Sequence, residues 1–257
     1  MYQEFLKVAL EAAKAAQETI GHYFEKVDVD VNYKNDNSPY TSADTEAEKI
    51  IKQVIKNAFP SHGFLGEESG IENPNNSFVW TIDPIDGTKN FIRRVPFFST
   101  LIALMHRNEV IVGVSMAPQI QETLYASKNQ GVFLNNQPIS VSKTTRLEEM
   151  YLGYGSLKHF LRARYVEQLL SLARSSMNSK SGLDFFNYHL LAQGKLDVVI
   201  EPSTHIWDVA PFDLIIKEAG GSFSDIHGEQ ITPDTTSAFA TNGLLRQAAL
   251  SKFHRLD

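Results

Sequence analysis

The stretch from Trp80 to Phe91 reads WTIDPIDGTKNF. Its first half is an apolar run typical of a strand, and the run leads directly into two acids, Asp83 and Asp86, which are three residues apart. The proline between them removes a backbone donor, and Gly87 permits a tight turn. We therefore expect a strand that ends with two carboxylates held close together.

Two carboxylates at this spacing need a cation between them. Like charges repel, and each raises the pKa of the other unless a cation joins them. Mg²⁺ prefers such oxygen ligands, so the pair favours a magnesium site. The amides after Gly87 begin a predicted helix, whose free N–H groups can bind an anion. A metal and a phosphate could thus meet at one turn. The alternative is an ordinary acidic turn in which Thr88 caps a helix.

Two further stretches place acids where secondary elements are expected to end or begin. Glu67 and Glu68 follow a short apolar run that ends at Gly66, and Asp208 opens a strongly apolar helix. Each has a simpler explanation by itself, which is a solvated surface for the glutamates and an N-cap role for Asp208. Acids at three such junctions together favour a cage in which the carboxylates converge.

Composition excludes several classes of site and of partner. The chain has 257 residues, 24 basic against 30 acidic, and a net charge of −6, which is the wrong sign for a surface that attracts nucleic acid. It has no cysteine, so disulfides and thiolate metal sites are excluded. No apolar stretch is long enough for a signal peptide or a membrane span. We expect a cytoplasmic enzyme with no nucleic-acid or membrane partner.

The first half of the chain predicts an α+β domain, residues 1–143, that carries the metal-binding motifs. Two helices are expected, at 1–24 and before Pro60, separated by a polar loop at 34–39. Strands and a hairpin near Asn135 should follow and form a largely antiparallel sheet. The expected strands are 78–82, 98–105, 110–117 and 123–126.

The second half predicts an α/β domain, residues 144–257, that completes the active site. Strands are expected at 151–154 and 196–200, and helices at 163–175, 186–192 and 208–219, the last ending at Gly220. No flexible linker separates the halves. We expect them to share a large interface with the site between them.

The combined motifs resemble those of the inositol monophosphatase superfamily, a group of Mg²⁺-dependent, lithium-sensitive phosphatases. The matching motifs are GEE at 66–68, DPIDGT at 83–88, WD at 207–208 and EAGG at 218–221. Their order and spacing match along nearly the whole chain. The resemblance implies a layered α-β-α-β-α sandwich of the inositol monophosphatase and fructose-1,6-bisphosphatase type. It also implies a homodimer.

The resemblance also assigns site residues. Two or three Mg²⁺ ions, for which Mn²⁺ is a possible substitute, would be held by Glu67, Asp83, the main-chain carbonyl of Ile85, Asp86 and Asp208. Thr88 would orient the attacking water with support from Asp44, and Glu67 would share in catalysis. Asp44 also fits a capping box with Thr41. The amides of Gly87 and Thr88 would contact the phosphate.

The implied mechanism needs no covalent phosphoenzyme. An acidic cluster binds a phosphate dianion only when cations lie between them, and those cations would bridge carboxylates to phosphate and activate water for in-line displacement. Lys34 and Lys89 are the basic residues nearest the motifs, and neither is assigned a role. His205 is expected to be a loop histidine paired with backbone.

The expected substrate is a small phosphorylated metabolite, first of all histidinol phosphate. The stretch from Asp83 to Phe91 and Asp184-Phe185 with Tyr188 look most like the histidinol-phosphatase branch. Asp184 and Glu201 would face the leaving group, where two acids suit a cationic amine. One departure is Leu183, which stands where that branch has glycine.

Other readings stay open. Inositol 1-phosphate is an alternative, since Glu201 would equally serve a hydroxyl. A 3′(2′),5′-bisphosphate nucleotidase is another, since Asn37-Ser38-Pro39 resembles that branch, although no second phosphate pocket is evident. A non-catalytic regulatory binding protein that keeps the fold is the alternative of a different class, and the intact set of acids argues against it.

Overall fold

The structure, a computed structural model, describes residues 2–26, 30–34 and 38–254. The helices are α1 (Gln3–Glu25), α2 (Ser42–Ala58), α3 (Thr88–Ile92), α4 (Leu157–Ala163), α5 (Val166–Ser175), α6 (Phe185–Ala192), α7 (Ile206–Glu218) and α8 (Arg246–His254), with 3₁₀ turns η1 (Pro118–Ile120) and η2 (Leu147–Glu149). The strands are β1 (Val31–Tyr33), β2 (Pro39–Thr41), β3 (Gly63–Gly66), β4 (Gly70–Glu72), β5 (Phe78–Asp86), β6 (Ser99–His106), β7 (Glu109–Ala117), β8 (Glu122–Ser127), β9 (Val132–Leu134), β10 (Gln137–Pro138), β11 (Tyr151–Tyr154), β12 (Asn178–Ser181), β13 (Val198–Glu201), β14 (Ser222–Ser224) and β15 (Ala238–Thr241).

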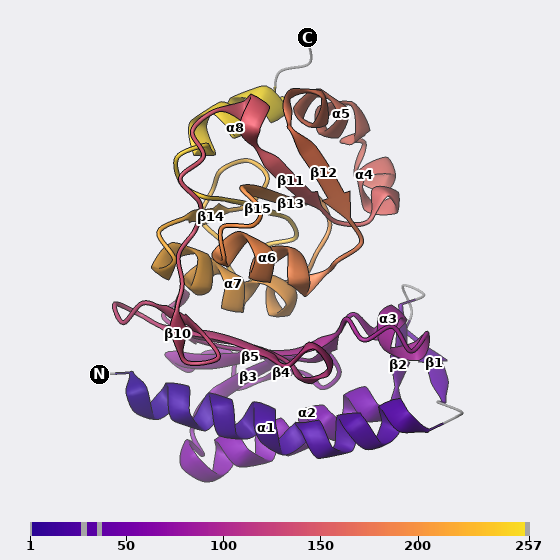
Figure 1. Cartoon of the computed structure of the whole chain (residues 1–257). Coiled ribbons are helices and arrows are strands. Elements are labelled where there is room, and N and C mark those ends of the chain that lie inside the picture. The colour runs from indigo at the N-terminus through magenta and orange to yellow at the C-terminus, as the bar shows by residue number, and fades with distance from the viewer. Residues whose placement is uncertain (1, 27–29, 35–37, 255–257) are drawn as a thin grey trace.

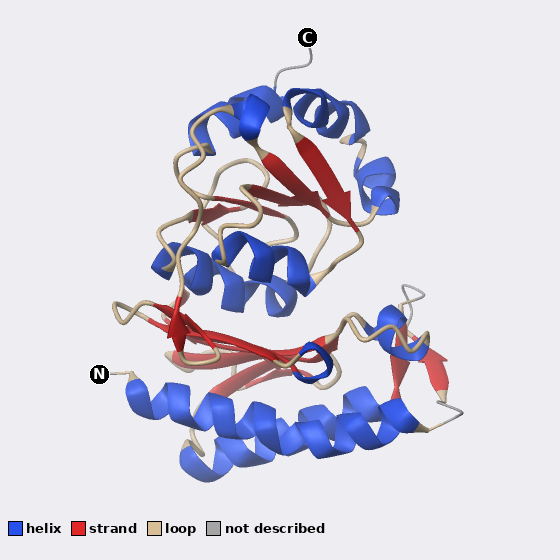
Figure 2. Cartoon of the chain, viewed as in Figure 1, coloured by secondary structure: helices blue, strands red, loops and turns tan. Residues whose placement is uncertain are grey.

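Helices and sheets alternate in five layers (Figures 1 and 2). Helices α1 and α2 cover one face of the larger sheet, and α6 and α7 separate its other face from the smaller sheet. Helices α4, α5 and α8 cover the far side of the smaller sheet. This is the predicted α-β-α-β-α sandwich, and the prediction is confirmed.

The larger sheet has the strand order β10-β9-β8-β7-β6-β5-β3-β4. Its pairs are antiparallel except β3 and β5, which run parallel with Gly66 opposite Ile82. The antiparallel character agrees with the sequence prediction. The one parallel pair matters for the site, because it brings the carboxyl ends of β3 and β5 to the same edge.

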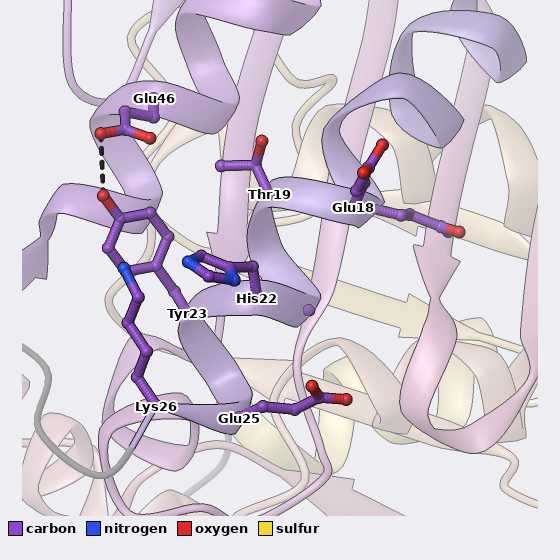
Figure 3. Close-up of a pocket in the computed structure, with 9 residues that line it drawn as sticks. Glu18, Thr19, His22, Tyr23, Glu25, Lys26 and Glu46 are labelled. Atoms are coloured by element: carbon purple, nitrogen blue, oxygen red, sulfur yellow. Dashed lines mark hydrogen bonds between the residues drawn. The ribbon is translucent and has the colours of Figure 1, made fainter.

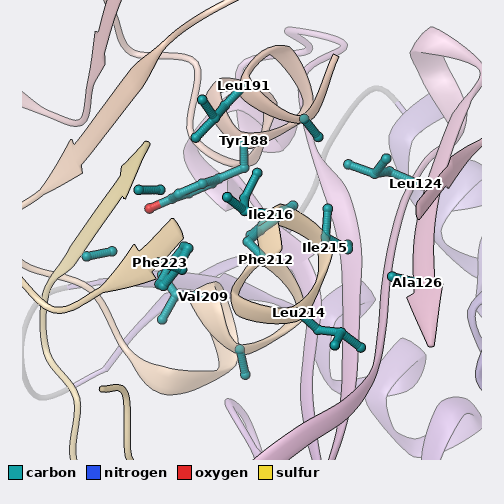
Figure 4. Close-up of a cluster of buried hydrophobic side chains, with 14 of the residues drawn as sticks. Leu124, Ala126, Tyr188, Leu191, Val209, Phe212, Leu214, Ile215, Ile216 and Phe223 are labelled. Carbon is teal, nitrogen blue, oxygen red and sulfur yellow. The ribbon is translucent and has the colours of Figure 1, made fainter. Parts of the chain in front are cut away.

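Both faces of this sheet are covered, so its central strands are apolar at consecutive positions rather than alternating with polar ones. Ile102 and Leu104 of β6 pack toward α1 and α2, while Leu101 and Ala103 of the same strand pack toward α6 and α7. Figure 4 shows the second of these cores, in which Tyr188 of α6 and Phe212 of α7 lie together with side chains from both sheets. The middle helices therefore bind the two sheets into one body.

The smaller sheet is mixed and has the order β12-β11-β13-β15-β14. Strand β11 runs parallel to both of its neighbours, and β15 runs antiparallel to both of its own. The predicted strand at 151–154 and the predicted α/β character of this half are found. The division of the chain between residues 143 and 144 stays a prediction.

Some predicted boundaries are wrong. The helix expected at 163–175 begins later, as α5 at Val166, because Arg164 adopts a left-handed φ of 63° and separates it from α4, which ends at Ala163 and was not predicted. The strand expected at 78–82 continues to Asp86, with a register shift against β6 between Asp83 and Asp86. The predicted polar loop at 34–39 lies partly outside the described residues, as does Asn37 of the motif that resembles nucleotidases.

None of the helices in the described ranges has the length and apolar content that crossing a membrane requires.

Candidate active site

The parallel pairing of β3 and β5 places the first acids. Glu67 directly follows β3, and its backbone N–H donates to the Ile82 carbonyl at 3.0 Å, one residue before Asp83. The Glu67 carboxylate lies close enough to Asp83 to disfavour ionisation of Asp83. Glu67 and Asp83, which are sixteen residues apart in the sequence, thus lie side by side at one edge of the sheet.

The turn after Asp83 is fixed by its own hydrogen bonds. Asp83 Oδ1 accepts from the Ile85 N–H at 2.9 Å, which folds the chain back between the two acids. Gly87 has a φ of 88°, and a Cβ there would lie 2.9 Å from the Phe97 carbonyl oxygen, so glycine is required for both conformation and space. Helix α3 begins immediately after it, as predicted, and its N-cap is Gly87 rather than Thr88.

Asp208 comes to the cluster from the other half of the chain. It is the third residue of α7, and its Oδ2 accepts from the His205 N–H at 2.8 Å and from Thr204 Oγ1 at 2.9 Å. The simpler expectation, that Asp208 is the N-cap, is therefore wrong, because His205 occupies that position. Asp208 still helps to hold the helix start while its carboxylate reaches the site.

Asp83, Asp86 and Asp208 form a compact cluster of acids. One oxygen from each lies within 4.8 Å of the others, and Asp83 is buried. Burial raises the pKa of Asp83 well above its usual range, and the neighbouring Glu67, Asp86 and Asp208 raise it further. The pKa of Asp86 is likewise raised by burial and then by Asp184 and Asp208. As it stands, the cluster carries more negative charge than its surroundings stabilise.

This donor set can hold a metal ion. Its atoms are carboxylate oxygens, with the Ile85 carbonyl oxygen at the same turn, and these are the ligands of hard cations. A divalent cation would offset the repulsion that raises both aspartate pKa values. The residues therefore fit the metal centre that the sequence motifs predict.

Lys34 contacts the glutamates of this edge. Its Nζ lies 2.8 Å from Glu67 Oε1 and 2.7 Å from Glu68 Oε1, and the glutamates raise the lysine pKa against the opposing effect of its burial. Lys34 was not assigned a role from the sequence. In this structure the Lys34 ammonium group is the positively charged partner of the Glu67 carboxylate.

Thr88 and Asp44 lie together as the resemblance implies. Thr88 Oγ1 is 3.4 Å from Asp44 Oδ1 and 3.1 Å from the Ile85 carbonyl oxygen. Asp44 also forms the predicted capping box of α2, since its Oδ2 accepts from the Thr41 N–H at 2.8 Å. Burial raises the pKa of Asp44 to about 6, against the Thr41 hydrogen bonds, which lower it. Both predicted roles are geometrically compatible.

Asp184 and Glu201 border the cluster on the side of the smaller sheet. Asp184 precedes α6 with a left-handed φ of 43°, and its Oδ2 accepts from Asn90 Nδ2 at 3.0 Å. The Phe185 N–H beside it donates to Asp86 Oδ2 at 3.0 Å. Glu201 is the last residue of β13. Its carboxylate lies against Gly155, where a Cβ atom would collide with it. Burial raises the Glu201 pKa, and the charges of Asp184 and Asp208 add to this effect.

Glu48 is a site residue that the sequence did not reveal. Only 1% of its surface is exposed, and its carboxylate accepts from the Glu68 N–H at 2.8 Å and the Ser69 N–H at 3.0 Å. It therefore holds the turn that presents Glu67. A signal was available, because Glu48 and Asp44 lie four residues apart on the apolar face of α2.

The remaining candidates lie apart from the acids or at their margin. The His205 ring stacks on Trp207 with 4.8 Å between ring centroids, and its Nδ1 is 3.7 Å from Asp208 Oδ2; His205 is the N-cap of α7 and forms a capping box with Asp208. A separate pocket lies at the end of α1, where Tyr23 donates to Glu46 (Figure 3). None of the predicted site residues lines that pocket.

The comparisons with known proteins agree with this geometry. The model of the inositol monophosphatase family matches residues 1–256. The chain belongs to the inositol monophosphatase family. Its members include proteins named for different substrates, and the chain is a phosphomonoesterase of this family.

Among its relatives, the histidinol-phosphatase of Mycobacterium tuberculosis is 34% identical over 259 residues, covering 99% of both chains. The inositol-1-monophosphatase of Mesorhizobium japonicum is 32% identical over 252 residues, covering 95% of this chain and 94% of that one. The crystal structure of the extragenic suppressor protein suhB from Bartonella henselae superposes with a TM-score of 0.90 at 28% identity, covering 98% of this chain and 99% of that one. Relatives with different names are thus similarly close.

Proposed function

We propose that this phosphatase uses Mg²⁺ and hydrolyses histidinol phosphate to histidinol, in histidine biosynthesis. The proposed metal ligands are Glu67, Asp83, the Ile85 carbonyl, Asp86 and Asp208, which would hold two or three ions. Ions held by these residues would supply neutralisation of the phosphate charge and stabilisation of charge on the departing oxygen. Mn²⁺ has the same ligand preferences and would substitute.

The protein's own groups then orient the reactants. Thr88 can accept a hydrogen bond from the attacking water while its hydroxyl donates to Asp44, which aims the water's lone pair at phosphorus. The amides of Gly87 and Thr88 are the proposed phosphate contacts. Glu67 shares in catalysis by holding its carboxylate beside that of Asp83.

The observation that carries the choice of substrate is the acid pair beside the cluster. The charged groups that act on Glu201 are the carboxylates of Asp184 and Asp208, so a buried acid stands among charges of its own sign. A buried charge without a partner is costly. The ammonium group of histidinol would supply the missing cation through charge-assisted hydrogen bonds. The similarity to a histidinol-phosphatase supports the same choice.

A comparison of two substrates tests this proposal. Histidinol phosphate and inositol 1-phosphate should be assayed with Mg²⁺ on the wild type and on Glu201→Gln and Asp184→Asn. We expect kcat/KM for histidinol phosphate to be the higher in the wild type and to fall at least tenfold more than that for inositol 1-phosphate in both variants. Faster hydrolysis of inositol 1-phosphate, or equal losses on both, would contradict the proposal.

Inositol 1-phosphate is the second candidate, because a Glu201 carboxyl kept neutral by burial can also bind a hydroxyl. A bisphosphate nucleotidase and a regulatory protein without catalysis have less support, since the set of acids for catalysis is assembled. Adenosine 3′,5′-bisphosphate in the same assay tests the first. The cytoplasmic location, the homodimer and inhibition by lithium stay predictions.

A further inference from the structure

A buried polar chain connects α6 to the larger sheet. His189 of α6 is fully buried, and its Nε2 lies 2.8 Å from Ser115 Oγ on β7. Its Nδ1 lies 2.8 Å from Glu122 Oε2 at the start of β8. Ser115 Oγ is in turn 3.3 Å from Ser99 Oγ on β6. This series of hydrogen bonds therefore runs from Glu122 at the start of β8, through His189 of α6 and Ser115 of β7, to Ser99 at the start of β6.

The surroundings of His189 are aromatic. Its ring lies 5.1 Å from that of Phe185, 6.0 Å from that of Phe186 and 6.2 Å from that of Phe212. Among the described residues the hydrogen-bond partners of the imidazole are Ser115 and Glu122, and a shift of α6 would leave the buried imidazole without them. Apolar contacts are non-directional and would tolerate small displacements of α6 against the sheet. The two directional hydrogen bonds of His189 fix the position of the helix.

A serine, a histidine and a carboxylate in this order also form the nucleophilic triads of hydrolases. Here the serine cannot act as a nucleophile, because Ser115 has no exposed surface and lies within the central strands of the sheet. The hydrogen-bonded residues Ser115, His189 and Glu122 therefore fix the position of α6 and take no part in bond making.

The first residue of α6 and the Ser99 end of this hydrogen-bonded series both connect to Asp86. Four residues before His189, the Phe185 N–H donates to Asp86 Oδ2 at 3.0 Å. At the other end of the chain, Ser99 is the residue paired with Asp86 across β5 and β6. The connections thus close a ring that contains a candidate metal ligand and the first turn of α6, a span of about 6 Å along the helix.

The residue directly before this ring, Asp184, has a strained backbone. Asp184 has φ 43° and ψ −128°, a region that residues with side chains rarely adopt. Its backbone keeps this conformation because both sides are fastened, by Asn90 on its carboxylate and by α6 after it. Loosening α6 would let Asp184 relax away from the pocket that it borders.

We propose that His189 is a positioning residue of the phosphatase: its hydrogen bonds to Ser115 and Glu122 fix α6 so that Asp184 meets the leaving group of the substrate while the Phe185 amide holds Asp86. The inference rests on the proposed role of Asp184 in binding that group. In this proposal His189 does not contact the substrate. It holds the residues on the leaving-group side of the site in their positions.

Selectivity between two substrates tests the inference. Histidinol phosphate needs the leaving-group side of the site, whereas p-nitrophenyl phosphate lacks the amine that Asp184 would bind. In His189→Leu we expect kcat/KM for histidinol phosphate to fall tenfold to a hundredfold, chiefly through KM, and that for p-nitrophenyl phosphate to fall less than threefold. Glu122→Gln and Ser115→Ala, which each weaken one hydrogen bond, should shift selectivity in the same direction by a smaller factor. His189→Gln can still donate to Glu122 and accept from Ser115, and it should recover part of the loss.

A matched control separates positioning from folding. His62 is also nearly buried and hydrogen-bonded, to Trp80 at the other end of β5, so His62→Leu should lower the melting temperature without changing the selectivity ratio. If the His189, Glu122 and Ser115 variants lower both activities equally, or leave the ratio at its wild-type value, the inference is wrong. A wild type that hydrolyses p-nitrophenyl phosphate with Mg²⁺ but not histidinol phosphate would instead overturn the proposed substrate.

Discussion

The hydroxyl of Thr88 lies between two acceptors, 3.1 Å from the Ile85 carbonyl oxygen and 3.4 Å from Asp44 Oδ1. It can donate to only one of them at a time, and its lone pairs remain available to a water molecule. This geometry joins a residue of α3 to one of α2 and brings both to the turn between Asp83 and Thr88. It suits a group that directs a water rather than one that attacks phosphorus itself.

Thr88→Ala should therefore lower kcat about 10²- to 10⁴-fold, because the attacking water loses the hydroxyl that orients it within the proton-transfer arrangement. Thr88→Ser keeps the hydroxyl and should retain activity within about tenfold of the wild type. Steady-state kinetics measures both, and calorimetry should find the affinity for Mg²⁺ unchanged in both. A threonine variant that loses metal binding along with activity would argue for a structural role.

Glu48 should stabilise the turn that carries Glu67. Replacing it with alanine leaves the amides of Glu68 and Ser69 without their acceptor, which costs about 1–3 kcal/mol. Urea unfolding measures this loss, and activity should fall as Glu67 loses its position. Glu46 lies on the exposed side of the same helix, so Glu46→Ala should change stability by no more than about 0.5 kcal/mol. Equal effects from both substitutions would refute the role of Glu48.

Lys34 should compete with the metal for Glu67. Its Nζ occupies the position beside Glu67 Oε1 that a cation would approach, and a partly exposed ion pair is worth about 0.2–1 kcal/mol. Lys34→Ala should thus bind Mg²⁺ up to about fivefold more tightly by calorimetry. Lys128→Ala removes a similar surface pair with Glu109 and should leave the affinity unchanged. Weaker Mg²⁺ binding in Lys34→Ala would show that the lysine supports the metal.

Stability should fall below neutral pH through His62. Trp80 Nε1 donates to His62 Nδ1 at 3.0 Å, which requires an unprotonated Nδ1, and burial lowers the His62 pKa below its usual value of 6.5. Between the lowered folded pKa and 6.5 the unfolded chain binds more protons, so stability is full above 6.5 and is lost as pH falls. The difference in unfolding free energy between the wild type and His62→Leu should therefore shrink from pH 8 to pH 5. A constant difference would contradict the neutral assignment.

Local patterns predicted the acids of this site better than they predicted their surroundings. The strand that ends at Asp83 and Asp86, the turn at Gly87 and the short helix after it all depend on neighbouring residues, so the sequence showed them. That Glu67 lies beside Asp83 depends on the parallel pairing of β3 with β5, which the local patterns did not predict, although acids at three junctions pointed to a common cage.

The missed features depend on tertiary contacts. Glu48 looks like an ordinary polar helix residue until the turn after Gly66 covers it, and Lys34 finds its partners only when β3 is in place. Arg164 separates α4 from α5 in a left-handed conformation that favours glycine, so no residue type marked that break. Strands β14 and β15 were not predicted, since three- and four-residue strands are stabilised by their neighbours more than by their own pattern.

The central claim is that the acidic cluster is incomplete without a divalent cation, and thermal unfolding of the wild type and Asp83→Asn, in EDTA and in Mg²⁺, tests it most directly. An asparagine can still accept from the Ile85 N–H while it removes a buried negative charge. We expect Mg²⁺ at a hundred times its dissociation constant to raise the wild-type melting temperature by about 5–10 °C. Asp83→Asn should gain little from Mg²⁺ and should unfold in EDTA at the wild-type temperature or above it. A wild type that gains no stability from Mg²⁺, or an Asp83→Asn variant that gains as much, would contradict the account.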